Sequence, residues 1–145
     1  MGFQFAETMA GTIEWADQPG VTEPFKFEVT AQAESTRDHL RDGRALLRGV
    51  VTSPPRITGA DAEGVITIRL FGEKIIRYEL SFLGDDGTAY ELVGQKDLRY
   101  LSPFKSFTHL PADILDEDHR RVATCTTTFD LRHDFWSFLR SFRSL

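Results

Sequence analysis

Hydrophobic and polar residues alternate along most of this chain with a period of two, which is typical of half-buried β-strands. The clearest example is the segment 74–97. Apolar residues at the even positions from Ile76 to Phe82 are separated by polar ones, a Gly-Asp-Asp-Gly turn follows at 84–87, and a second strand-like run continues to Asp97. This pattern predicts a β-hairpin, and a hairpin needs further strands to bury its apolar face.

The same alternation predicts strands on both sides of the hairpin. The expected strands are 3–15, 25–33, 45–51, 65–71, 106–115 and 121–131. Turn-forming residues separate some of them, at 17–20 and 116–118. We expect 56–64 to form a loop, and Gly11 to mark a bend or a bulge within the first strand.

The last segment, 133–145, has a different period. Phe135, Phe138, Leu139 and Phe142 follow i, i+3, i+4, i+7 spacing, which predicts an amphipathic helix. We expect its aromatic stripe to dock on the sheet. The alternative is a free stripe that binds a partner protein or a second copy of the chain in a homodimer.

These elements predict an all-β fold, a mostly antiparallel meander barrel of the lipocalin (calycin) kind, with about seven to nine strands and a C-terminal amphipathic helix. Closing the sheet would remove its exposed edges. A β-sandwich is the alternative, because both architectures bury one face of every strand. A chain of 145 residues suits a single β-barrel domain spanning 1–145.

Composition and charge argue against several classes of protein. The chain has 22 acidic and 17 basic residues and no basic stripe, so we do not expect it to bind nucleic acid. Cys125 has no partner for a disulfide, and neither a signal peptide nor a membrane span is recognisable, so we expect a cytoplasmic protein. Its histidines lack metal-ligand spacing and no Gly-x-Gly-x-x-Gly fingerprint occurs, so we expect neither a metal nor a cofactor.

Two charged residues interrupt apolar strand faces. These are Glu7 in the first strand and Lys96 near the end of the hairpin. They could form a structural ion pair between the two elements, or reach solvent at the strand ends. They could instead form a polar anchor inside an apolar cavity, holding a ligand hydroxyl or carboxylate. With neighbouring aromatic residues, the candidate ligand-binding residues are Glu7, Phe27, Tyr78, Tyr90 and Lys96; we nominate no catalytic residue.

Three parts of the sequence resemble a known family. They are Phe-Ala-Glu-Thr-Met-Ala-Gly at 5–11, the hairpin segments 77–82 and 94–97, and the C-terminal segment 134–143. In this order they resemble a small accessory β-domain found fused to, or beside, GMC-type (cholesterol-oxidase-like) flavin oxidoreductases and some α/β-hydrolases in bacteria. The resemblance covers nearly the whole chain. It implies a bacterial protein associated with lipid or steroid metabolism, with a GMC-type oxidoreductase as its partner.

These observations lead to three functional hypotheses. The first is a non-catalytic β-barrel module that binds an apolar small molecule, a lipid or steroid, or that serves as an accessory subunit of a lipid-modifying oxidoreductase. The second is a small barrel enzyme of the isomerase or cyclase type, in which burial has shifted the pKa of Glu7 or Lys96 so that it acts as acid or base. The third is a structural oligomerisation domain.

Overall fold

The computed structural model describes residues 3–33, 43–69, 72–97, 109–129 and 143–144, and these residues are arranged almost entirely as β-strands and tight turns. The strands are β1 (Phe3–Trp15), β2 (Thr22–Ala33), β3 (Arg44–Ser53), β4 (Ile57–Arg69), β5 (Ile75–Leu83), β6 (Ala89–Asp97), β7 (His109–Leu115), β8 (Arg121–Thr128) and β9 (Arg143–Ser144). No helix occurs in the described ranges. The all-β prediction is therefore confirmed there.

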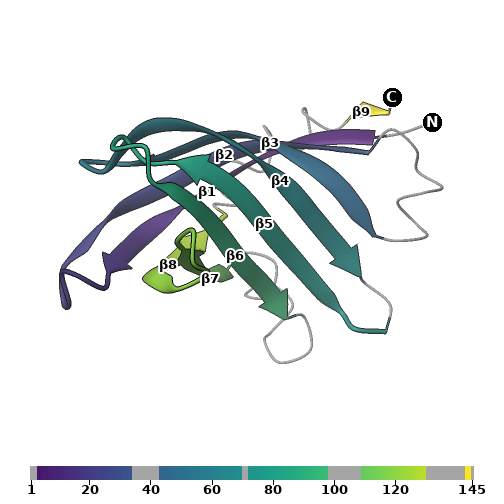
Figure 1. Ribbon diagram of the computed structural model, residues 1–145. Helices are drawn as coiled ribbons and strands as arrows, with labels where there is room; N and C mark the ends of the chain where they lie inside the picture. Colours follow the sequence, from purple (N-terminus) through teal and green to yellow (C-terminus); the bar gives the residue numbers. More distant parts are fainter. Residues whose placement is uncertain (1–2, 34–42, 70–71, 98–108, 130–142, 145) are drawn as a thin grey trace.

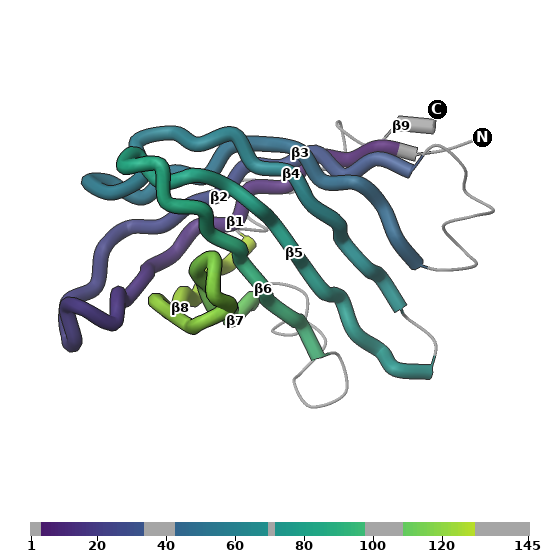
Figure 2. The backbone as a smooth tube through the Cα atoms, in the orientation of Figure 1, coloured from purple at the N-terminus to yellow at the C-terminus, as the bar shows by residue number. Residues whose placement is uncertain are grey.

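The sheet closes on itself. Each of the first seven strands pairs antiparallel with the next, and β1 also pairs with β8, so β1 to β8 form a barrel (Figure 1). Figure 2 traces the same meander as a continuous tube, in which β2 to β6 follow one another side by side. The short strand β9 pairs with the beginning of β1. Closure confirms the barrel and excludes the sandwich, because the two ends of the sheet are hydrogen-bonded to each other.

The hairpin 74–97 is confirmed as β5 and β6, which pair along their whole lengths from Ile75↔Asp97 to Leu83↔Ala89. Its turn contains Gly87 with a φ of 85°, a conformation that glycine adopts without strain. The backbone N–H of Gly87 donates to the carbonyl of Gly84 over 2.9 Å. The turn therefore forms at 84–87, as the sequence predicted.

The loop expected at 56–64 is wrong. Strand β4 begins at Ile57 and is paired with β3 through this segment, from Ser53↔Ile57 to Leu47↔Gly64, with one register shift near Ser53. The segment carries small residues such as Ala62, and these give weak hydrophobic alternation. Its strand conformation is decided by its pairing with β3, and β5 joins on the other side from Glu63 onward.

Of the bend or bulge expected at Gly11, the bulge is wrong, because the pairing of β1 with β8 runs through Gly11↔Thr127 without a register shift. A Cβ atom at Gly11 would lie 1.9 Å from the carbonyl oxygen of Thr126. Glycine is required here by the close approach of two backbones.

The C-terminal helix predicted at 133–145 falls mainly on residues 133–142, which lie outside the described part of the chain. Its predicted end is wrong, because Arg143–Ser144 form the strand β9 beside Phe3 and Gln4 of β1. Residues 70–71, 106–108 and 130–131 of the expected strands also lie outside the described ranges.

The hydrophobic core lies inside the barrel. Inward-facing positions are buried and outward-facing positions are exposed or half-exposed, most regularly along β2 from Phe25 to Ala33. The largest fully buried side chains are Tyr78, Phe25, Phe27, Met9, Ile13, Leu47, Ile57, Ile66, Leu80, Leu92, Leu110 and Ile114. Burying a large apolar side chain contributes about 1.5–3 kcal/mol, so this interior dominates the stability of the fold.

Candidate ligand-binding site

Three buried residues of the described chain are polar or charged: Ser53, Lys96 and Thr127. The hydroxyl of Ser53 donates to the carbonyl of Pro24 over 2.8 Å, and that of Thr127 lies 3.4 Å from the carbonyl oxygen of Leu110. These two hydroxyls satisfy the backbone of neighbouring strands. Lys96 differs from them, because its exposed fraction is only 3% and it carries an ionisable amine.

Lys96 faces a tyrosine inside the barrel. The alternation of β5 and β6 turns Tyr78 and Lys96 inward, and Lys96 pairs in the sheet with Ile76, two residues before Tyr78. The amine nitrogen Nζ lies 5.2 Å from the centroid of the Tyr78 ring. This is a cation–π distance, and the ring face partly replaces the water that the amine has lost.

The hydroxyl of Tyr78 donates a hydrogen bond to Oε1 of Glu7 over 2.5 Å. Glu7 occupies an inward position of β1, between the buried residues Phe5 and Met9, and is itself half-buried. We call Glu7, Tyr78 and Lys96 the polar cluster. It joins β1 to the β5–β6 hairpin through the barrel interior.

Burial governs the charge states of Tyr78 and Lys96. Loss of solvation raises the pKa of Tyr78 well above its usual value, and the Glu7 carboxylate raises it further, so the phenol stays protonated as a donor. Loss of solvation lowers the pKa of Lys96, while the attraction of Glu7 acts in the opposite direction. The pKa of Lys96 is lowered overall, so desolvation outweighs this attraction.

Phe27 of β2 packs beside the cluster. Its ring centroid lies 5.9 Å from that of Tyr78, with an interplanar angle of 61°, and Phe25 lies 6.4 Å from Phe27 on its own strand. Such edge-to-face contacts stabilise aromatic pairs beyond simple burial. Four of the five residues nominated from sequence, Glu7, Phe27, Tyr78 and Lys96, are therefore brought together.

Tyr90, the fifth nominated residue, belongs to another part of the barrel. Its ring lies 5.5 Å from Trp15 and 5.8 Å from Phe82. Along β6 it is six residues before Lys96, which corresponds to roughly 20 Å of extended strand. Tyr90 therefore lies near the end of the barrel that carries the turns 16–21, 54–56 and 84–88, which we call the turn end.

The turn end contains features that the sequence reasoning missed. The Arg56 guanidinium lies 4.4 Å above the Trp15 ring and pairs with Asp17 over 2.6 Å, and this bond lowers the pKa of Asp17. Trp15 Nε1 and Glu23 Oε2 are buried and have no hydrogen-bond partner among the described residues. Glu23 could have been found from the sequence, because it is a charged residue on the inward side of β2, as Glu7 is on β1.

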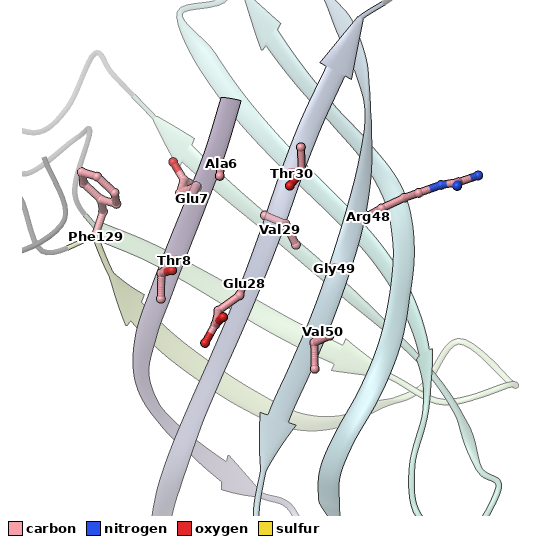
Figure 3. Close-up of a pocket in the computed structure, with 10 residues that line it drawn as sticks. All are labelled: Ala6, Glu7, Thr8, Glu28, Val29, Thr30, Arg48, Gly49, Val50 and Phe129. Carbon is pink, nitrogen blue, oxygen red and sulfur yellow. The ribbon is translucent and has the colours of Figure 1, made fainter. Parts of the chain in front are cut away.

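A hollow of about 350 Å³ lies against β1, β2 and β3 (Figure 3). It is lined by Ala6, Glu7, Thr8, Glu28, Val29, Thr30, Arg48, Gly49, Val50 and Phe129. In Figure 3 the Glu7 side chain and Phe129 lie on the same side of β1, and Arg48 extends in the opposite direction. Glu7 lines this hollow and also accepts the bond from Tyr78, so it links the hollow to the polar cluster.

A second hollow of about 500 Å³ lies on the outer face of the sheet. Its lining residues are Arg44, Thr67, Arg69, Glu73, Ile75, Arg77, Glu79 and Gln95. Two of its arginines are paired with carboxylates, in Arg69–Glu73 at 2.6 Å and Arg77–Glu79 at 2.9 Å. Because these pairs neutralise much of the positive charge, we do not consider this hollow an anion site.

Within the described ranges, no group of three or more His, Cys, Asp or Glu side chains is placed to hold a metal ion. That part of the chain also contains no helix that is long and apolar enough to cross a membrane.

No protein-family model matches this chain, and no curated protein matches it. One similar solved structure is a de novo designed fluorescence-activating β-barrel, which is 14% identical, with a TM-score of 0.46. The alignment covers 86% of this chain and 92% of the designed one.

Proposed function

We propose that this barrel binds an apolar small molecule, of lipid or steroid character, and that the polar cluster holds the single polar group of that molecule. The observation that carries the proposal is the amine of Lys96, buried in an apolar core beside the Tyr78–Glu7 hydrogen bond. Small-molecule sites commonly combine apolar walls with a few converging polar groups.

The cluster favours a hydroxyl group over a carboxylate. The amine of Lys96 is a donor and the carboxylate of Glu7 is an acceptor, so a ligand hydroxyl could accept from the first and donate to the second. A ligand carboxylate would gain from Lys96 but would be repelled by Glu7. We therefore infer an alcohol on an otherwise apolar skeleton as the preferred class of ligand.

The balance of energies at Lys96 supports a functional role over a structural ion pair. A buried ion pair stabilises a fold only where mutual attraction exceeds the cost of desolvation. At Lys96 desolvation outweighs the attraction of Glu7, as the direction of its pKa shift indicates. Buried ionisable residues whose pKa is perturbed by desolvation and a charged neighbour cluster at functional sites.

Native mass spectrometry of the freshly purified protein would show whether a ligand is carried along. Binding would then be titrated by calorimetry with three compounds of one steroid skeleton, bearing a hydroxyl, a carboxylate or neither. We expect the alcohol to bind most tightly, and Lys96→Met and Glu7→Gln each to weaken it about tenfold or more, as loss of a hydrogen bond to a charged group does. Glu14→Gln, at an exposed position of the same strand, is the matched control.

Equal affinity for the three compounds, or equal affinity of wild type and both cluster variants, would exclude the cluster as the anchor. Absence of binding to any of them, with no co-purified ligand, would remove the binding proposal as a whole.

Acid–base catalysis is the second candidate. The observation that favours it is the lowered pKa of Lys96 beside a protonated phenol, because a lysine with such a pKa can exchange a proton nearer to neutral pH. Incubating the protein with a ketosteroid or an unsaturated lipid in deuterated water would test it. Deuterium incorporation that Lys96→Met abolishes would support an isomerase-type reaction, and no incorporation would argue against it.

The association with a GMC-type oxidoreductase stays a prediction from sequence resemblance. It would be tested by affinity purification of the tagged protein from its native cells. Recovery of such an enzyme in stoichiometric amount would support the accessory-subunit hypothesis, and recovery of the chain alone would count against it. Sedimentation of the same sample would separate a homodimer from a monomer and so test the oligomerisation hypothesis.

A further inference from the structure

We propose that Lys96 binds carbonyl ligands covalently, by forming a reversible imine with an aldehyde or ketone that enters the barrel. This inference rests on the proposed binding function and deepens it, because it names a second class of ligand and a bond to one atom, Nζ of Lys96. The same interior that would accept an apolar alcohol would accept the carbonyl compound of the same skeleton.

The surroundings of Lys96 meet two requirements of imine chemistry. The attacking amine must be neutral, and desolvation favours the neutral form at this position. The product must also be kept from water, because imines hydrolyse readily. With 3% of Lys96 exposed and the fully buried ring of Tyr78 beside its amine, bulk water is excluded.

The reaction balances without an additional reagent. The lone pair of Nζ attacks the carbonyl carbon and forms a C–N bond, and the carbonyl oxygen takes one proton from nitrogen to give a carbinolamine. The C–O bond then breaks, and the oxygen leaves as water with the second proton of the amine. Nothing is oxidised or reduced, and hydrolysis reverses each step.

Glu7 and Tyr78 have distinct roles in this proposal. A protonated imine carries a positive charge at nitrogen, and the carboxylate of Glu7, which already interacts electrostatically with Lys96, balances that charge. Tyr78 fixes Glu7 through their 2.5 Å hydrogen bond and places its ring face against the nitrogen. Tyr78 is thus a positioning residue, and Lys96 is the residue that reacts.

Borohydride trapping would test the inference. The intact protein would be incubated with trans-cinnamaldehyde and sodium cyanoborohydride, which converts an imine into a stable secondary amine. The mass gain equals that of the aldehyde less one oxygen atom, and peptide mapping locates it. We expect labelling of Lys96 to be at least tenfold faster than labelling of Lys26 or Lys74, which lie at exposed positions.

Three controls make the result specific. Lys96→Met should lose the fast label and keep the slow one. Glu7→Gln should reduce the fast label, and Glu14→Gln on the same strand should leave it unchanged. In concentrated urea the preference for Lys96 should disappear, because all the lysines are then equally solvated.

Failure of this inference can be distinguished from failure of the proposed function. Cinnamyl alcohol would be titrated against the same samples. If the alcohol binds but the aldehyde labels Lys96 no faster than Lys26, the imine is refuted and non-covalent binding stands. If the alcohol does not bind and no preferential label forms on a folded protein, both proposals are wrong for ligands of this size.

Discussion

The Tyr78 hydroxyl on β5 lies 2.5 Å from Oε1 of Glu7 on β1, although the two residues are 71 positions apart in the chain. In the order of the barrel, β5 stands four strands from β1 in either direction, so the two strands face each other across the interior. The bond therefore spans the barrel from wall to wall. The neighbouring Lys96 is held within the same span.

Removing this bond should reduce stability measurably. Tyr78→Phe deletes the donor and leaves a half-buried carboxylate without it, so we expect a loss of about 1–3 kcal/mol in the free energy of unfolding. Urea denaturation of Tyr78→Phe, Glu7→Gln and the double variant gives the coupling between the two side chains. A coupling energy near zero would mean that the short contact contributes nothing to stability.

Lys96→Met should behave in the opposite way. Methionine has a similar shape and no charge to desolvate, so we expect the free energy of unfolding to stay within about 1 kcal/mol of wild type or to increase. Ligand binding should be weakened about tenfold or more in the same variant. If Lys96 were instead half of a stabilising ion pair, its replacement would cost about 3–5 kcal/mol, a difference that chemical denaturation resolves easily.

The difference in stability between Lys96→Met and wild type should depend on pH. Because the pKa of Lys96 is lower in the folded state than its ordinary 10.5, the unfolded chain binds this proton more tightly, and wild-type stability rises with pH from the folded pKa up to about 10.5. The advantage of Lys96→Met should therefore be largest at neutral pH and shrink as the pH approaches that value. Denaturation at a series of pH values from 7 upward checks this, and a constant difference would contradict it.

Tyr78 affects the pH dependence of stability in the opposite direction to Lys96: at higher pH it makes the free energy of unfolding fall as the pH rises. Its pKa is raised in the folded state, so its stabilising contribution is complete below the ordinary value of 10.0 and is lost as the pH rises further. We expect stability to fall less between neutral pH and a pH above about 10 in Tyr78→Phe than in wild type. Thermal melting across this range is the measurement, and parallel curves would refute the expectation.

Gly49→Ala should destabilise the barrel strongly. A Cβ atom there would lie 1.8 Å from the carbonyl oxygen of Glu28, so β2 and β3 would have to separate. We expect a loss of at least about 3 kcal/mol, the upper end of what overpacking costs. Gly20→Ala is the control: it has a φ of 81° and open space around it, so its cost should be only about 1 kcal/mol of backbone strain. Similar melting temperatures for the two variants would contradict the predicted close contact.

Cys125 should be chemically inert in the folded protein. Burial raises the pKa of its thiol to about 12, with a smaller contribution from Asp113, so the reactive thiolate is scarce at neutral pH. A thiol reagent at pH 8 should label native protein orders of magnitude more slowly than urea-unfolded protein. Rapid labelling of the native state would show that β8 opens readily.

The sequence alone was sufficient to predict features that depend only on residues close together in the chain. Alternation with a period of two determined which side chains of β2, β5 and β6 face the core, because the geometry of a strand fixes that alternation whatever its neighbours. A charge on an apolar face, such as Glu7 or Lys96, was equally visible. The short connections between strands also favoured the antiparallel meander that the structure confirms.

Only the tertiary structure decided what these residues contact. Glu7 meets Tyr78, not merely the hairpin in general, because the number of strands and their closure place β1 opposite β5, and no local pattern encodes that number. Likewise, Ile57 to Gly64 became a strand because β3 supplies hydrogen bonds along it and β5 joins from Glu63 onward, although its own small residues gave no clear alternation. Local sequence fixes the direction of a side chain, and the long-range pairing of backbones fixes its partner.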